Sequence, residues 1–224
     1  MIIGISGKKQ SGKDLAAKII MYFESHAFEK WSFEKYLEHL NQGHIGTFGY
    51  GYKSKFQIVK FADKLKQIVC LLTGCTLKDL EDEIFKNSIL PKEWSTEEKG
   101  IIFTPTYRQS LQFIGTNMFR DMFHPNTWVN ATMSEYKCLY EDDFGKYYPD
   151  WIIPDVRFPN EVSAIKEKNG ILIRISSTRS KEDNHESETA LDNYSDWDYL
   201  IENNGSIEDF LEKIKLICIK EDII

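Results

Sequence analysis

Apolar residues recur along this chain with two periods, and segments of the two kinds alternate. Continuous apolar runs a few residues long are typical of buried strands, whereas apolar residues three or four positions apart indicate amphipathic helices. The runs predict strands at 2–6, 56–61, 151–158, 171–175 and 199–201. The helical spacing predicts helices at 14–25, 63–72, 77–85, 107–119, 159–168 and 207–219. Alternating strands and helices predict an α/β fold with a mostly parallel sheet and helices on both faces.

Two stretches follow neither period. Residues 41–55 are rich in glycine and aromatic residues and indicate a long loop or a hairpin. Residues 176–192 are polar and dense in charge, with almost no apolar residue before Leu191. This composition fits a lid that closes over phosphates, and it fits a solvent-exposed disordered loop equally well.

The first predicted strand leads directly into a glycine-rich turn. Gly7 begins the pattern Gly-x-x-x-x-Gly-Lys, which ends at Lys13, and a helical pattern starts at once. The glycines allow a tight turn in which several backbone N–H groups point at one oxyanion, and the helix N-terminus adds partial positive charge. The order of strand, glycine loop and helix predicts a site for a nucleoside triphosphate. The residues expected to contact ATP here are Gly7, Lys8, Lys9, Gln10, Ser11, Gly12, Lys13 and Asp14.

Asp14 stands where such loops usually carry a Ser or Thr hydroxyl for Mg²⁺. A carboxylate could hold Mg²⁺ directly or through a water molecule. It could also cap the first turn of the helix, where Asp is favoured. We favour the metal, because an anion beside the phosphates needs a cation between them.

The predicted strand at 151–158 carries Asp155 and Arg157 near its end. This is where phosphate-loop enzymes place the acid that orients Mg²⁺, and Arg157 lies on the same side of the chain. Glu161, one helical turn later, could hold Arg157 or touch a substrate, whereas the alternative is a surface ion pair. Pro154 removes a ladder donor, so we expect hydrogen bonding to a neighbouring strand to stop there.

The predicted helix at 107–119 carries a second group of polar residues. Arg108, Gln112 and Thr116 recur at every fourth position and would share one helix face. Arg can grip a phosphate with two hydrogen bonds, and Gln can read a base or a sugar. A solvated face is the alternative, but Gly115 in mid-helix suggests close approach by a ligand or another backbone.

Composition sets limits on the function. The 224 residues suit a single domain, and 42% hydrophobic with 28% charged residues is the composition of an ordinary globular protein. The net charge of −7 argues against coating nucleic acid, and no apolar run is long enough to span a membrane. The chain enters a strand without a signal peptide, and the cysteines lack metal-site spacing. We therefore expect a cytoplasmic protein with free thiols.

With these residues assembled, the chain resembles the bacteriophage deoxynucleoside monophosphate kinases, a branch of the P-loop nucleotide kinases. The resemblance covers nearly the whole length. The motifs that carry it, in order, are Ser-Gly-Lys-Asp at 11–14, Phe-Ala-Asp-Lys-Leu-Lys at 61–66, Arg-x-x-x-Gln-x-x-Gly-Thr-x-x-x-Arg at 108–120, Asp-Val-Arg-Phe-Pro-Asn-Glu at 155–161, His-x-Ser-Glu at 185–188 and the Asn-x-Gly turn at 203–205. Leu15 departs from the family, which commonly has Thr there, and Pro154 replaces a small polar residue. The stretch at 41–55 looks like an insertion.

The resemblance implies a three-layer P-loop NTPase-type fold in one domain, 1–224, with a monophosphate-binding helical part at about 63–135 and a lid-like loop at about 176–192. It implies transfer of a phosphoryl group from ATP, with Mg²⁺, to a deoxynucleoside 5′-monophosphate. The implied catalytic residues are Lys13, Asp14, Arg108, Asp155 and Arg157, and Asp14 and Asp155 would hold the metal. Arg174 and Arg179 would join the ATP site and, together with His185, would belong to a closing lid. The implied monophosphate site comprises Arg108, Gln112, Gly115, Thr116, Arg120, Trp128, Arg157, Glu161 and His185.

Two other functions stay open at this point. One is a kinase of a different phosphorylated acceptor, such as a phosphomevalonate kinase, and the other is a non-catalytic nucleotide-binding module. Arginines at several separate places favour an enzyme. The expected partners are ATP and deoxynucleoside monophosphates, without nucleic acid or membrane, in the host-cell cytoplasm if the chain is viral. Base preference, selectivity for deoxyribose and a homodimeric state stay open.

Overall fold

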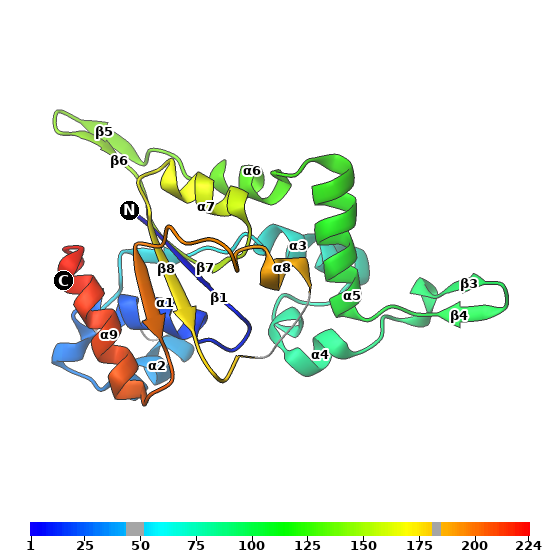
Figure 1. Cartoon of the computed structure of the whole chain (residues 1–224), viewed down its shortest axis with the longest axis horizontal. Helices are drawn as coiled ribbons and strands as arrows, with labels where there is room; N and C mark the ends of the chain where they lie inside the picture. The colour runs from blue at the N-terminus through cyan, green and yellow to red at the C-terminus, as the bar shows by residue number, and fades with distance from the viewer. Residues whose placement is uncertain (44–51, 181–184) are drawn as a thin grey trace. The chain divides into compact units, whose positions relative to one another are not determined.

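The computed structural model describes residues 1–43, 52–180 and 185–224. Its central sheet is parallel throughout, with the strand order β2-β7-β1-β8-β9 (Figure 1). These strands are β1 (Ile2–Gly7), β2 (Phe56–Ile58), β7 (Asp150–Val156), β8 (Ile171–Ser176) and β9 (Tyr199–Glu202). Every residue of β1 is buried, because β1 lies in the middle of the sheet with helices on both faces. The predicted α/β fold is confirmed.

Helices cover both faces of this sheet. On one face, Ile3 and Ile5 of β1 share a core with α1 (Lys13–Glu24) and α9 (Ile207–Lys220), and α2 (Phe33–Asn41) packs on α1 (Figure 1). On the other face lies α7 (Pro159–Lys166), whose Ile165 fills the space beside Gly4. A Cβ atom at Gly4 would lie 2.6 Å from Ile165 Cδ1, so β1 approaches α7 closely.

The chain divides into two compact units. The first contains Met1–Lys60 and Tyr136–Ile224, and the second contains Phe61–Glu135. Besides the sheet and its helices, the first unit holds η1 (Ala27–Glu29), the hairpin β5 (Tyr140–Asp142) and β6 (Gly145–Tyr147), and α8 (Glu186–Thr189). The second unit spans nearly the same residues as the helical part expected at 63–135. Whether that part binds a monophosphate stays a prediction.

The second unit is mainly helical and has a small core of its own. Val69, Leu80, Leu90 and Tyr107 are buried together there. Its elements are α3 (Asp63–Thr73), η2 (Asp79–Glu81), α4 (Glu83–Asn87), η3 (Lys92–Trp94), the hairpin β3 (Thr96–Glu98) and β4 (Ile101–Phe103), α5 (Tyr107–Gln112), the π-helix η4 (Phe113–Phe123) and α6 (Thr127–Met133).

Several boundaries differ from the prediction. The helix expected at 77–85 is instead the short η2 followed by α4, because Asp82 between them is extended and caps α4 by accepting a hydrogen bond from the Phe85 amide. The helix expected at 107–119 changes into a π-helix after Gln112. Helices α2 and α6 and both hairpins were not predicted. The stretch expected as a loop or hairpin at 41–55 lies in part outside the described residues.

Pro154 lies inside β7 rather than at its end. Pairing of β7 with β2 stops at Ile152, whose carbonyl accepts a hydrogen bond from Val59, as the proline suggested. On the other side, pairing with β1 resumes at Val156 after a shift in register. The extra residue forms a bulge, which tolerates a missing donor. The expectation that pairing stops at Pro154 is therefore right toward β2 and wrong toward β1.

Two further findings concern the cysteines and the helices. All four cysteines are free thiols. Among the residues that the structure describes, no helix has both the length and the apolar character that crossing a bilayer requires.

Candidate active site

The glycine loop joins β1 to α1, and close contacts fix both of its glycines. A Cβ atom at Gly7 would lie 2.5 Å from Ser11 Oγ, and Gly12 has φ +104°, a conformation that favours glycine. Lys13 folds back over the loop and donates hydrogen bonds to the carbonyl oxygens of Gly7 at 2.6 Å and Lys8 at 2.7 Å. The loop therefore has the tight backbone that a phosphate site needs, with a cation beside it.

Lys13 is buried among charged groups. Burial lowers the pKa of Lys13 to about 8, and Arg157 and Arg174 act in the same direction, whereas Asp14 and Asp155 raise it. These four side chains come from α1, from the end of β7 and from β8, so the structure brings the predicted residues together around the loop. A polyanion bound there would favour the charged form of Lys13.

Asn203 ties the loop to the far end of the chain. Its Nδ2 donates to the Ser11 carbonyl at 2.9 Å, and a Cβ atom at Gly12 would lie 2.6 Å from the same nitrogen. Arg179 donates to the Asn203 carbonyl at 2.7 Å and to Oδ1 at 3.0 Å. Arg179 therefore stabilises the turn that holds the loop.

The two predicted metal ligands lie on different elements of the same unit. Asp14, in the first turn of α1, pairs with Lys60 at 2.7 Å. Asp155 lies near the carboxyl end of β7. Both carboxylates are close enough to Lys13 to influence its charge.

Glu161 lies in the first turn of α7 and is almost completely buried. Its carboxylate accepts hydrogen bonds from the backbone amides of Arg157 at 2.7 Å and Phe158 at 3.2 Å. Glu161 therefore holds the backbone that positions Arg157, and its predicted contact with a substrate stays a prediction.

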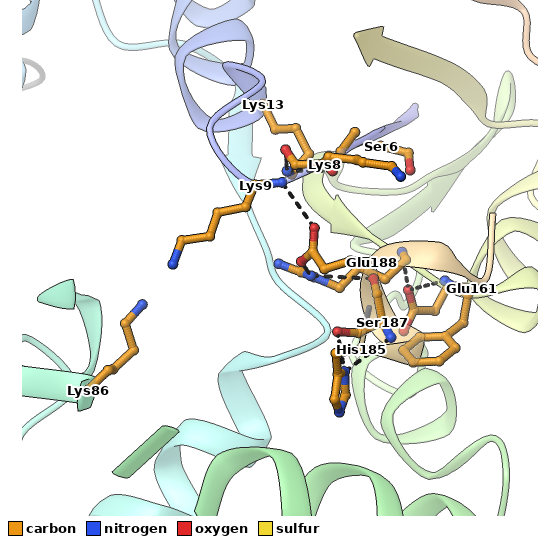
Figure 2. Close-up of polar contacts among 12 residues, drawn as sticks. Ser6, Lys8, Lys9, Lys13, Lys86, Glu161, His185, Ser187 and Glu188 are labelled. Carbon is orange, nitrogen blue, oxygen red and sulfur yellow. Dashed lines mark hydrogen bonds and ion pairs between the residues drawn. The ribbon is translucent and has the colours of Figure 1, made fainter. Parts of the chain in front are cut away.

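Residues 185–188 lie against Arg157 and the glycine loop. Arg157 Nη1 donates to the Ser187 carbonyl at 3.4 Å and pairs with Glu188, while the Lys9 amide donates to Glu188 Oε2 at 3.0 Å (Figure 2). His185 accepts a hydrogen bond from the Ser187 amide at 3.2 Å and so caps α8. The structure thus gives His185 a capping role, and its predicted contact with a substrate is untested.

Asp192 joins two further basic residues of the site. It accepts from Lys8 Nζ at 3.0 Å and from Arg174 Nη2 at 3.3 Å. Arg174 Nη1 also donates to Ser6 Oγ at 2.9 Å, and its guanidinium lies over the Trp197 ring. Burial lowers the pKa of Arg174, an effect that Asp192 opposes.

The predicted acceptor residues between 108 and 128 lie in the second unit, whereas Arg157, Glu161 and His185 lie in the first. Arg108 donates from Nε to Asn87 Oδ1 at 2.9 Å and from Nη2 to Glu83 Oε2 at 2.7 Å. Trp128 is buried and donates from its indole nitrogen to the Gly115 carbonyl at 2.8 Å.

Packing explains Gly115. A Cβ atom there would lie 2.7 Å from Leu65 Cδ2 on α3, so its close neighbour is a side chain and not another backbone. The argument from Gly115 to a ligand loses its basis, and its place in a binding site stays a prediction.

Arg108 and Gln112 lie in α5, and Thr116 lies in the π-helix η4. Residues four positions apart stay on about the same side of a helix whose hydrogen bonds run from i to i+5, so the common face of the three residues stays a prediction. The binding roles of Gln112, Thr116 and Arg120 are untested.

Comparison with known proteins decides the family. The family model described as deoxynucleotide monophosphate kinase matches residues 52–214. The chain belongs to the deoxynucleotide monophosphate kinase family. It is therefore a nucleotide kinase, a phosphotransferase, and the resemblance seen in its motifs is confirmed.

Two viral relatives of this kinase agree. A putative deoxynucleotide monophosphate kinase of Acanthamoeba polyphaga mimivirus is 30% identical over 220 residues, which cover 96% of this chain and 94% of the relative. A deoxynucleotide monophosphate kinase of Enterobacteria phage T4 is 30% identical over 109 residues, which cover 48% of this chain and 43% of the relative.

Some residues of the candidate site have contacts that the sequence does not predict. Glu188 and Asn203 lay in recognised motifs, His-x-Ser-Glu and Asn-x-Gly, but were given no role. Asp192 is one acidic residue in a charged stretch, and Lys60 merely precedes the Phe-Ala-Asp motif. Their partners are far away in sequence, so no local pattern could have revealed these contacts.

Proposed function

We propose that this kinase transfers the terminal phosphoryl group of ATP to a deoxynucleoside 5′-monophosphate. The observation that carries the proposal is the position of Lys13, Arg157 and Arg174 around one glycine loop, at the carboxyl ends of three adjacent parallel strands. Ligands bind at this edge of open α/β sheets. The names of both viral relatives support this acceptor class.

The proposed chemistry depends on positioning and charge. Phosphoryl transfer needs two anionic groups brought into line and their charge neutralised, with little covalent help from the protein. We assign Lys13 and the loop amides to the phosphates of ATP. Arg157, whose backbone is fixed by Glu161, would stabilise the charge on the group in transfer.

The residues present fit Mg²⁺. Among the described residues there is no group of three or more His, Cys, Asp or Glu side chains that could hold a metal alone. Mg²⁺ does not require one, because it keeps several waters and binds through one or two carboxylates together with substrate phosphates. Asp14 and Asp155 would supply these carboxylates, and the bound ion would neutralise phosphate charge.

The acceptor side of the proposal rests on the second unit. Arg108 would bind the monophosphate group, with Gln112, Thr116 and Trp128 around the nucleoside and Arg120 as a further phosphate contact. Arg108 is already oriented by Glu83 and Asn87.

A coupled assay of ADP release tests the proposal. The purified kinase is supplied with ATP, Mg²⁺ and, one at a time, the common deoxynucleoside monophosphates, their ribonucleoside counterparts and phosphomevalonate. We expect turnover with deoxynucleoside monophosphates, its loss on removing Mg²⁺ with EDTA, and none in Lys13→Met. Turnover with phosphomevalonate alone, or with no acceptor in the panel, would overturn the proposal.

A further inference from the structure

Glu188 contacts two groups that we assign to phosphate. Its Oε2 accepts a hydrogen bond from the Lys9 amide at 3.0 Å, and its carboxylate pairs with Arg157 (Figure 2). The Glu188 side chain is only 7% exposed. A carboxylate this deeply buried depends on these partners, because an unpaired buried charge is costly.

The surrounding segment fixes the position of this carboxylate. His185 caps α8 at its start, and Leu191 beyond its end is buried. Between them, Ser187 presents its carbonyl to Arg157. Glu188 is therefore held against the loop from both sides.

Asp192 is a second carboxylate that accepts hydrogen bonds from residues of the site. It accepts from Lys8 and Arg174, two further residues expected to contact ATP. Its side chain is 37% exposed, so its contacts are weaker than those of a buried group.

We propose that Glu188 is an internal anion that competes with nucleotide phosphates for the loop. A backbone N–H makes one good hydrogen bond, so the Lys9 amide cannot serve Glu188 and a phosphate oxygen together. Two anions at one position also repel each other. Binding of ATP therefore requires Glu188 to leave the Lys9 amide, and the contact lowers the apparent affinity for phosphate. This inference rests on the proposed function.

Direct binding of inorganic tripolyphosphate and of ATP, measured by titration calorimetry, tests the competition. Glu188→Gln keeps the size of the side chain and removes its charge. Because charge-assisted hydrogen bonds are among the strong ones, we expect both Kd values to fall about tenfold. Glu186→Gln is the matched control, since it removes the same charge from an exposed residue of α8 and should leave Kd unchanged.

Two more variants distinguish competition for the Lys9 amide from a general effect of negative charge near the loop. Glu188→Asp keeps the charge and withdraws the carboxylate by one methylene group, so it should also tighten binding. Asp192→Asn should give a smaller gain. If Glu188→Gln tightens binding and Glu188→Asp does not, the effect is one of net charge and competition for the amide is wrong.

The remaining outcomes are distinct. Unchanged or weaker binding in both Glu188 variants, with a lower kcat, would mean that Glu188 positions Arg157, and it would overturn the competition. If the wild-type kinase and all variants bind neither ATP nor tripolyphosphate, the proposed function itself fails, and the inference fails with it. A folded state confirmed by circular dichroism accompanies each titration.

Discussion

The positively charged side chain of Lys13 is buried, so water solvates it poorly. Its ammonium group relies on the carbonyl oxygens of Gly7 and Lys8, and its pKa is lowered to about 8 chiefly by burial. Such a group is poised to gain from an anionic ligand, because in a poorly solvated site the attraction between charges is strong.

Lys13→Met should therefore remove turnover with little effect on folding. We expect kcat to fall at least about 100-fold, the usual loss for a group that stabilises transition-state charge. The free energy of unfolding should fall by no more than about 2 kcal/mol, because only two carbonyls lose a donor. The coupled assay and urea denaturation measure the two effects. Near-wild-type turnover in the folded variant would remove Lys13 from the mechanism.

Asp14→Asn should test Asp14 as a metal ligand. The N-cap of α1 is Gly12 and Asp14 lies in the first turn, so replacing its carboxylate by an amide of the same size should change stability little. The Mg²⁺ concentration for half-maximal rate should rise about tenfold. Lys60→Met is the control, because it removes the ion-pair partner of Asp14 but leaves the carboxylate. An unchanged Mg²⁺ requirement in Asp14→Asn would show that Asp14 is not a ligand.

The free thiols should react in an order set by burial. Burial raises the pKa of Cys218 to about 12, so almost no thiolate forms at pH 8, whereas Cys138 is exposed. The thiolate is the reactive form. Iodoacetamide labelling followed by mass spectrometry should show Cys138 modified first and Cys218 last, with the difference lost in urea. Equal rates in the native protein would contradict the buried position.

At the scale of elements, the loop between β1 and α1 depends on a turn near the opposite end of the chain. Asn203 lies between β9 and α9 and reaches the Ser11 carbonyl, 192 residues away in sequence. The glycine loop is therefore held in shape by a side chain outside its own motif.

Asn203→Ala should loosen the loop. We expect it to lower the free energy of unfolding by about 1–3 kcal/mol, because a buried acceptor loses its donor. KM for ATP should rise severalfold. Asn204→Ala is the control, since Asn204 accepts from Thr178 in the same turn and does not touch the loop, so KM should stay unchanged. Equal KM effects in both variants would mean that the turn as a whole matters, and not the tie to Ser11.

Elements whose own residues specify them could be predicted, and those specified by distant partners could not. The run at 2–6 and the spacing at 207–219 indicated β1 and α9, because burial follows the local pattern there: β1 is buried throughout, and Phe210, Ile214, Ile217 and Cys218 of α9 are buried. The change to a π-helix after Gln112 has no such pattern, since packing of Gly115 against Leu65 and Trp128 accompanies it.

The candidate site also contains residues that a local motif marks and residues that only distant partners place. The glycine loop and Asp155 are marked by motifs, and the structure places them around Lys13. Glu188 reaches the loop from 179 residues away along the chain, so its role could be seen only in three dimensions. For α2, the signal was present, because Phe33 and Tyr36 are spaced as in a helix and Ser32 caps it.

At the scale of the whole molecule, the net charge is negative, whereas the site around the glycine loop combines charges of both signs. The chain carries −7 overall, and Lys13, Arg157 and Arg174 gather in one site together with Asp14 and Asp155. A mononucleotide meets only the local field, but a long polyanion meets the field of the whole surface.

The kinase should therefore not bind duplex DNA. In fluorescence anisotropy at about 0.15 M salt, we expect Kd for a labelled duplex to be weaker than about 0.1 mM. ATP titrated under the same buffer conditions is the positive control. Micromolar binding of the duplex that weakens steeply with added salt would contradict this prediction. It would show that the protein has a basic surface despite its negative net charge.

The central place of β1 has a consequence for the rate of folding. Its two neighbours in the sheet, β7 and β8, begin at Asp150 and Ile171, and β2 pairs with β7 alone. The ladders of β1 therefore cannot form between adjacent segments, and the entropy of closing a long loop must be lost before β1 is paired, whereas β8 and β9 follow one another in the chain and can pair without such a loop. Until then both edges of β1 stay open to pairing with other chains. Slow, aggregation-sensitive folding is thus a consequence of the same strand order that places the glycine loop at the middle of the sheet.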